Sequence, residues 1–445
     1  MSFFDNPEFR RNCWLKLSPI RLALMPVVIL LVIMAIKAGD GGGQTIRMLA
    51  CLGFLAMTAL GGAKEASGAL REEFSCGTWD SQRMSSLTPW QMVWGKLFGS
   101  TLYVWYGGVI LLGVAAFAAH GEGARIENIA LTGVIFVEVA LFLQCSAMLS
   151  TLCAWRMNRQ TKQTMIGILV VFLFVFLMWG MICGIVVYDS DKFETIAWRH
   201  QVWDLQDLRD LFALFLFLLI AWVFIALWQV MRAEFLLRNH LGWWLAFYTF
   251  WLLWGAGFVE KNWFVFFLSA VLVVWVSIYL FLFSGRKDQM AWLRLLTAFR
   301  RRDIRLLQHL APGWLISFAV LVVLCVCALF AAGKQEGALF VFFASGLSFV
   351  VRDIVFILWI NLVAARRPDV TAVLYLLVAY CVLPSFFGNL FLPPFLSRDY
   401  MKLLFSTDFS FTMPTFSISP LFAALLQAGL AGYLLHRRLS LNPPR

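Results

Sequence analysis

Few residues of this chain have the types and surroundings that chemistry needs, and the most conspicuous lie inside apolar stretches. Glu138 lies in the middle of the run VIFVEVALFLQ, and Arg352 and Asp353 interrupt another run. An ionisable side chain inside a membrane is costly unless it faces the protein interior or a water-filled path. Glu138 is therefore a candidate for lining a translocation path, with a buried, hydrogen-bonded carboxyl group as the alternative. For Arg352 and Asp353 a structural ion pair is the favoured interpretation, and a position at the inner membrane interface is the alternative.

A third group is the charged segment from Lys64 to Lys96, which separates two long apolar stretches. Glu72 and Glu73 within it offer carboxylates that can pair with basic residues of a partner. The alternative is that both carboxylates are merely solvated. Trp79 is an apolar residue that can anchor such a partner.

Helix signals divide this segment into pieces. Gly77 interrupts one helix, and Thr78 is the predicted N-cap of a short second helix that extends to Leu87. Thr88 and Pro89 predict the start of a third helix, because Thr caps well and Pro suits the first helical position. A short helix at the membrane face suits contact with a soluble partner.

Several chemistries have no recognisable motif in the chain. There is no Gly-x-x-x-x-Gly-Lys-Ser/Thr loop, no His-Glu-x-x-His and no Gly-x-Ser-x-Gly. The nine Cys form no Cys-x-x-Cys pair and the five His are scattered. We therefore expect no metal, no cofactor and no enzymatic activity in this chain. A lipid-modifying enzyme remains a rival, with Asp189, Asp191 and Glu194 available but without recognisable spacing.

Composition places these residues in a membrane. The chain has 445 residues, of which 61% are hydrophobic and only 14% are charged. Soluble globular proteins do not have this composition. The apolar stretches predict an all-α, polytopic membrane protein of about twelve spans. Their approximate ranges are 20–37, 46–63, 97–119, 128–154, 164–188, 211–231, 241–259, 262–284, 312–332, 337–365, 370–388 and 416–435.

Charge predicts the orientation. With both termini on the cytoplasmic side, the inner segments carry most of the 36 Lys and Arg residues, as the positive-inside rule requires. The net charge of +11 then reflects this bias and attraction to membrane lipids, so no nucleic-acid partner is expected. We expect a multi-pass protein of the cytoplasmic (inner) membrane. Residues 7–17 predict a surface helix with Phe9 and Trp14 on its apolar face and with Arg11, Asn12 and Lys16 on the opposite face.

Two domains are predicted, residues 1–231 and 232–445, each with six spans. A weak similarity relates Phe9-Arg10-Arg11 before Pro19 to Phe299-Arg300-Arg301 before Pro312. The second domain is therefore a candidate degenerate repeat, with a plain six-plus-six arrangement and chance similarity as alternatives.

The segment from Lys64 to Lys96 resembles the permease subunits of type-2 ABC transporters, a largely export-directed family. Short pieces between the second and third spans carry the resemblance: Arg71-Glu72-Glu73, Gly77-Thr78, Leu87-Thr88-Pro89 and Gly95-Lys96-Leu97. The predicted surface helix is similar to that family's connecting helix. The resemblance covers residues 7 to about 231. The chain departs from the family in having Trp79-Asp80 in place of Leu-Glu, and about twelve spans in place of six.

The resemblance implies a permease subunit of an ATP-driven exporter. A separate ABC ATPase dimer would bind ATP and Mg²⁺ and would dock on a short cytoplasmic coupling helix. The coupling residues carried over are Glu72, Glu73, Gly77, Thr78, Trp79, Thr88 and Pro89. A homodimer and a single chain that supplies both halves both remain open. The other rival is a twelve-span transporter driven by an ion gradient, which would need intramembrane carboxylates in both halves.

Overall fold

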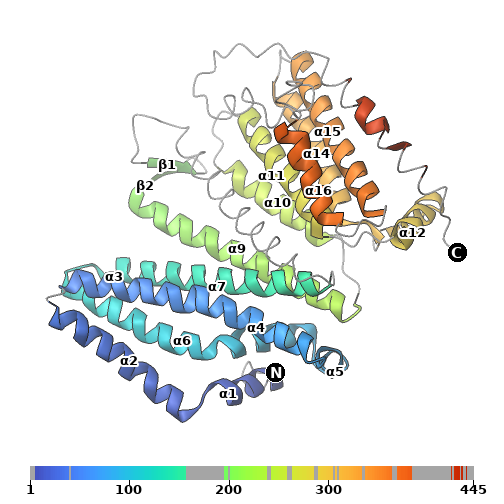
Figure 1. The fold of residues 1–445 in the computed structure, drawn as a ribbon. Coiled ribbons are helices and arrows are strands. Elements are labelled where there is room, and N and C mark those ends of the chain that lie inside the picture. The colour runs from blue at the N-terminus through green and yellow to red at the C-terminus, as the bar shows by residue number, and fades with distance from the viewer. Residues whose placement is uncertain are drawn as a thin grey trace. The chain divides into compact units, whose positions relative to one another are not determined.

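The computed structural model is almost entirely helical (Figure 1). Contacts divide the chain into two compact units, which are described separately: residues 1–172 with 203–239, and residues 173–202 with 240–445. The structure describes residues 6–39, 42–156, 195–198, 201–237, 242–257, 263–284, 289–303, 306–307, 310–332, 336–362, 368–382, 422, 425–430, 432–433 and 437.

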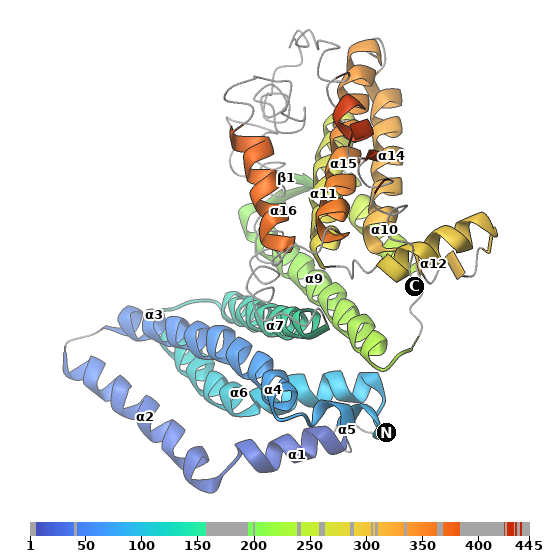
Figure 2. The same ribbon diagram turned by 45° about the vertical axis from the view of Figure 1, so that its right-hand side comes forward.

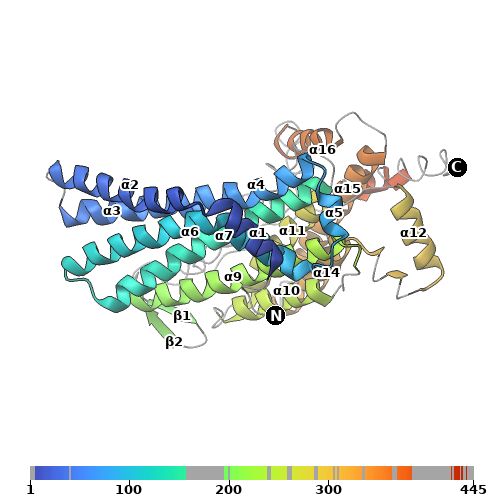
Figure 3. The same cartoon turned by 90° about the horizontal axis from the view of Figure 1, so that it is seen from below.

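The first unit is a bundle of long helices that run side by side (Figures 1 and 3). A short helix, α1, leads into the bundle at one end, and a shorter one, α5, lies at the same end. The elements are α1 (Pro7–Lys16), α2 (Pro19–Ala38), α3 (Gly43–Phe54), η2 (Leu55–Gly61), α4 (Gly62–Ser75), α5 (Trp79–Arg83), α6 (Pro89–Gly121), α7 (Ile126–Arg156) and α9 (Leu205–Glu234).

Three of these helices begin where local sequence signals place them. Asn6, Ser18 and Thr88 each cap a helix whose first residue is proline, and each side chain accepts a hydrogen bond from a backbone N–H of the first turn. At Thr88 the capping box is complete, because the Gln91 side chain also accepts from the Thr88 N–H at 2.9 Å.

The second unit is also a helical bundle, in which α12 runs across the direction of its neighbours (Figure 2). Its buried core is drawn from α10, α11, α14, α15 and α16. The elements are α10 (Gly242–Ala256), α11 (Trp263–Ser284), α12 (Gln289–Arg300), α14 (Gly313–Ala332), α15 (Glu336–Leu362), α16 (Pro368–Leu377) and η4 (Val378–Val382). Two short strands, β1 (Thr195–Trp198) and β2 (Gln201–Asp204), form a small sheet.

Among the described residues, seven helices are long and apolar enough to cross a membrane: Pro19–Ala38, Gly43–Ser75, Pro89–Gly121, Ile126–Trp155, Arg209–Glu234, Gly313–Phe330 and Phe342–Asn361. The chain is a helical membrane protein. The number twelve stays a prediction. The predicted span 164–188 lies outside the described residues, as does most of 416–435.

Two of these helices are much longer than a bilayer requires. Gly43–Ser75 and Pro89–Gly121 have 33 residues each. A straight helix of that length is about 50 Å long, whereas the hydrocarbon core is about 30 Å thick. Each helix is therefore long enough to cross the lipid and to extend beyond it at its polar end, near Ser75 or Pro89.

Helix α1 lies on the bundle with a different face from the one predicted. Glu8, Phe9 and Asn12 are buried, whereas Trp14 is 88% exposed. The amphipathic pattern treated Asn12 as solvent-facing. That expectation was wrong, because polar side chains of α1 pack against α6.

Candidate functional site

The candidate site lies at the end of the first unit where α1, α4, α5 and α6 meet (Figure 2). Gly77 ends α4 with a left-handed backbone, φ +70°. The N–H of Thr78 then donates to the carbonyl of Glu73 at 3.1 Å, which closes the helix end. The predicted interruption at Gly77 and Thr78 is thus present, and glycine meets the backbone requirement.

Helix α5 is shorter than predicted, because it ends at Arg83 and not at Leu87. The Ser85 hydroxyl donates to the carbonyl of Gln82 at 2.6 Å, which favours a turn over helix continuation. Thr78 is the N-cap residue of α5, as predicted, but its side chain makes no capping hydrogen bond. Its hydroxyl instead donates to the Glu73 carbonyl at 3.4 Å.

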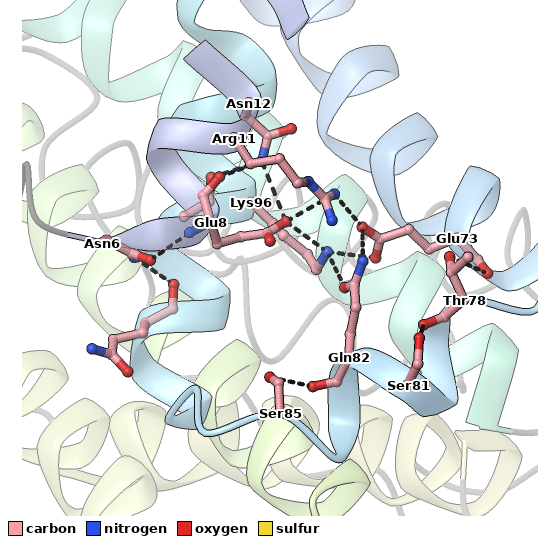
Figure 4. Close-up of polar contacts among 12 residues, drawn as sticks. Asn6, Glu8, Arg11, Asn12, Glu73, Thr78, Ser81, Gln82, Ser85 and Lys96 are labelled. Carbon is pink, nitrogen blue, oxygen red and sulfur yellow. Dashed lines mark hydrogen bonds and ion pairs between the residues drawn. The ribbon is translucent and has the colours of Figure 1, made fainter. Parts of the chain in front are cut away.

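A charge cluster with a buried centre lies behind α5 (Figure 4). We use this name for Glu8, Arg11, Glu73, Gln82 and Lys96. Lys96, whose side chain is only 1% exposed, donates to Glu8 Oε1 at 3.0 Å, to Gln82 Oε1 at 2.8 Å and to Glu73 Oε2. One ammonium group therefore joins α1, α4, α5 and α6.

The remaining partners complete the cluster. Arg11 donates to Glu73 Oε1 at 2.8 Å, and its guanidinium lies 3.2 Å from Glu8 Oε1. The amide nitrogen of Gln82 donates to Glu73 Oε1 at 2.7 Å. Partial burial lowers the pKa of Arg11, but the hydrogen bond to Glu73 and the nearby carboxylates raise it more, so the net shift is upward. Two cations face two carboxylates, which makes the cluster neutral.

Close helix packing allows α1 to reach this cluster. A Cβ atom at Gly95 would lie 2.7 Å from the Glu8 Cβ, and one at Gly99 would lie 2.7 Å from the Asn12 Cβ. Small residues four apart let two helices approach at short distance. The Asn12 amide spans the contact, donating to the carbonyls of Glu8 at 2.9 Å and of Gly95 at 3.5 Å.

Trp79 is buried inside the unit. Its exposed fraction is 2%, its ring lies edge-on to Phe74 at 4.9 Å, and Lys96 Nζ lies 5.9 Å from its centroid. It belongs to a core of residues from α4, α6, α7 and α9, including Leu70 and Met92. This differs from the expectation that Trp79 anchors a partner, because the indole anchors α5 to its own bundle.

The predicted coupling residues therefore fall into two groups. Glu73 and Trp79 face inward, whereas Glu72, Gly77, Thr78 and Thr88 are exposed, and Pro89 begins α6. The surface of the loop also presents Cys76, Asp80, Met84, Ser85 and Ser86, with Met84 86% exposed. This surface is what a soluble partner can touch.

Sequence reasoning missed Glu8, Arg11 and Gln82 as members of the site. One signal was available: Lys96 is an isolated charge in an apolar helix, and Gly95 and Gly99 beside it are spaced for a close neighbour. Nothing in the sequence says that this neighbour is α1.

The intramembrane charges lie elsewhere. Glu138 is 8% exposed and its Oε2 atom has no hydrogen-bond partner in the described part of the chain. In the second unit, Arg352 Nε donates to Asp353 Oδ1 at 2.9 Å, which agrees with the predicted structural pair. Three tyrosines, Tyr279, Tyr375 and Tyr380, also donate to Asp353.

Within the described residues, no three His, Cys, Asp or Glu side chains form a group that could hold a metal ion. The outer-loop acids Asp189, Asp191 and Glu194 lie outside the described residues. Comparisons of the chain with protein families, with curated proteins and with solved structures find no match.

Proposed function

We propose that this chain is the membrane-spanning permease subunit of an ATP-driven transporter of the type-2 ABC kind, with export as its direction. A separate ATPase dimer binds ATP and Mg²⁺ and contacts the loop between Ser75 and Thr88. The chain itself carries no ATP-hydrolysing site. Its membrane is the cytoplasmic membrane, with both termini on the ATPase side.

The observation that carries this proposal is the connection of α5 to three other helices through Lys96. A partner that displaces α5 moves Gln82, whose side chain contacts both Lys96 and Glu73. Those two residues lie on α6 and α4, and Lys96 also holds Glu8 on α1. Displacement of the five-residue helix α5 is therefore transmitted to α4 and α6, which belong to membrane-spanning helices, and to α1, which precedes the first span.

The outer surface of the loop suits contact with a separate, soluble subunit. Met84 offers an exposed apolar side chain, and Asp80 and Glu72 offer carboxylates that no described ion pair buries. The inward residues Glu73 and Trp79 transmit displacement and do not touch the partner. Rearrangement of the spans then opens a path for the cargo.

The test is photo-crosslinking of the full chain in its native membranes. A photoreactive residue at Met84 is compared with one at Ile126, which is 72% exposed at the opposite end of α6 and α7. We expect Met84 to capture a protein that carries a Gly-x-x-x-x-Gly-Lys-Ser/Thr loop and binds ATP, and Ile126 not to capture it. Capture at neither position, or equally at both, contradicts the proposal. The mass of the solubilised complex then decides between a homodimer and one chain.

A second candidate is a transporter driven by an ion gradient. One observation favours it: each unit contains a buried carboxylate in a membrane-spanning helix, Glu138 in α7 and Asp353 in α15. This candidate predicts that proteoliposomes of the chain alone take up protons under an imposed gradient, and that Glu138→Gln abolishes the uptake. The ATP-driven proposal predicts no such flux from the chain alone.

A further inference from the structure

The helix that leads to the charge cluster changes its winding within the membrane. Between α3 and α4, residues Leu55–Gly61 form a π-helical segment, η2. The N–H of Gly62 accordingly reaches back to the carbonyl of Met57, five residues earlier. Such turns are rare, pack less favourably than α-helix and concentrate at functional positions. This one divides a continuous 33-residue span into two parts.

A side chain from another helix is bound to this segment. The amide nitrogen of Gln144, on α7, donates to the carbonyl of Thr58 at 2.8 Å. Its amide oxygen accepts from the indole N–H of Trp105, on α6, at 3.2 Å. Gln144 and Thr58 are both 0% exposed. The Gln144 amide thus links α6, α7 and the π-helical segment away from solvent.

The space around this amide fits it closely. A Cβ atom at Gly62 would lie 2.3 Å from Gln144 Nε2 and 2.9 Å from its Cδ. On the other side, a Cβ atom at Gly108 would lie 2.4 Å from Thr58 Cγ2. Glycine at these two positions therefore lets α6 and the Gln144 side chain approach the segment.

We propose that η2 is a hinge in the second span and that Gln144 is the positioning residue that latches it. A carbonyl that leaves the regular ladder inside a membrane is costly unless another donor reaches it. Gln144 supplies that donor to Thr58. The hydrogen bond thereby stabilises the π-helical arrangement of the segment.

The hinge lies between two parts with different attachments. On the C-terminal side of η2, α4 carries Glu73 about 18 Å further along the helix, where the charge cluster holds it. On the N-terminal side of η2, α3 packs on α6 through Gly53 and Leu111. Displacement of α4 at the loop can then be absorbed at η2 while α3 stays in place. This last step rests on the proposed function, whereas the hinge and its latch do not.

Hydrogen exchange of the full chain in lipid nanodiscs tests the latch without any cargo or ATPase. We expect the amides of residues 58–63 to exchange faster than those of α3. Gln144→Met keeps the length of the side chain but removes both hydrogen bonds, and we expect it to speed exchange in residues 58–63 by about tenfold. Ser146→Ala is the matched control, because Ser146 is buried on the same helix and its hydroxyl has no partner in the described part.

Two milder variants keep the test decisive if Gln144→Met does not fold. Trp105→Phe removes the donor to the Gln144 oxygen, and Gly62→Ala displaces the Gln144 amide without changing it. Both are expected to speed exchange at residues 58–63, and Gln144→Glu, which keeps an acceptor for Trp105, is expected to fall between wild type and Gln144→Met. Exchange at 58–63 no faster than in α3, or unchanged in these variants, overturns the hinge. Absence of an ATPase in the crosslinking experiment overturns the proposed function alone.

Discussion

Lys96 Nζ lies 3.0 Å from Glu8 Oε1, although the two residues are 88 positions apart in the sequence. Both side chains are nearly inaccessible, at 1% and 4% exposure. The contact fixes α1, which precedes the first span, to the start of α6. The helix predicted to lie on the membrane surface is held by an ion pair inside the protein.

The first prediction removes the ammonium group at the centre of the charge cluster. Lys96→Met keeps most of the side-chain volume but leaves Arg11 as the one cation of the cluster facing two carboxylates, Glu8 and Glu73. Breaking a buried ion pair from one side costs about 3–5 kcal/mol. We expect a large drop in the thermal unfolding temperature of the chain in detergent. Tryptophan fluorescence monitors the unfolding.

Lys64 provides the control, because it is an exposed lysine on α4. Lys64→Met should change the free energy of unfolding by less than about 0.5 kcal/mol. Adding Glu8→Gln to Lys96→Met should restore part of the loss, because Arg11 and Glu73 then remain as one cation facing one carboxylate. No recovery in that double variant would mean that Lys96 stabilises the fold by packing alone.

The second prediction separates two adjacent glutamates. Glu73 contacts Arg11, Gln82 and Lys96, whereas Glu72 is exposed. Glu73→Ala should destabilise the chain by about 3 kcal/mol or more. Glu72→Ala should leave stability unchanged within about 0.5 kcal/mol but weaken association with the ATPase in a pull-down. The opposite pattern, with Glu72 the stabilising residue, would refute the inward placement of Glu73.

The helix starts of this region could be predicted because each depends on adjacent residues. Asn6 before Pro7, Ser18 before Pro19 and Thr88 before Pro89 supply a cap and a fixed φ without help from the rest of the chain. The break at Gly77 is local for the same reason. Apolar length likewise identified the regions of the seven described helices that are long and apolar enough to cross a membrane.

The charge cluster could not be predicted, because its members come from four helices. Asn12 is polar and Trp14 apolar, so periodicity placed Asn12 in solvent, whereas packing on Gly95 and Gly99 buries Asn12 and exposes Trp14. In a membrane protein an exposed tryptophan costs little, since lipid replaces water as its neighbour. An amphipathic pattern therefore does not predict which face of a helix at the membrane surface is buried in the protein.

The third prediction concerns the close approach of α1 and α6. Gly95→Ala places a methyl group 2.7 Å from Glu8 Cβ, so α1 must move away. Overpacking of this kind costs about 1–3 kcal/mol. We expect faster cleavage of α1 by trypsin, at Arg10, Arg11 and Lys16, in the intact detergent-solubilised protein.

Gly113 offers a matched control on the same helix, because a Cβ atom there meets nothing within 4 Å. Gly113→Ala should be neutral or stabilise the helix by up to about 1 kcal/mol, because alanine favours helix more than glycine does. Equal trypsin sensitivity in the two variants would show that α1 does not depend on the space above Gly95.

The fourth prediction concerns the second unit. Asp353 accepts from Arg352 at 2.9 Å, from Tyr279 at 2.6 Å and from Tyr375 at 3.1 Å, and it is 0% exposed. Asp353→Asn keeps the shape but removes the charge, so Arg352 remains buried without a counter-ion. We expect a loss of about 3–5 kcal/mol in the free energy of unfolding. Ser348→Ala on the same helix should cost far less, because its hydroxyl donates to the Ala344 carbonyl one turn earlier and meets no charged partner among the described residues.

A double-mutant cycle decides whether the two charges act as a pair. Arg352→Gln alone leaves Asp353 with its tyrosine donors but without its cation, and should also destabilise the chain. If Arg352 and Asp353 satisfy each other, the double variant should cost less than the sum of the single variants by about 1–3 kcal/mol. Strict additivity would show that Arg352 is held by its other contacts, with Gln427 at 2.7 Å and the Phe349 ring at 4.7 Å. The tyrosines would then be the partners that keep Asp353 in the membrane.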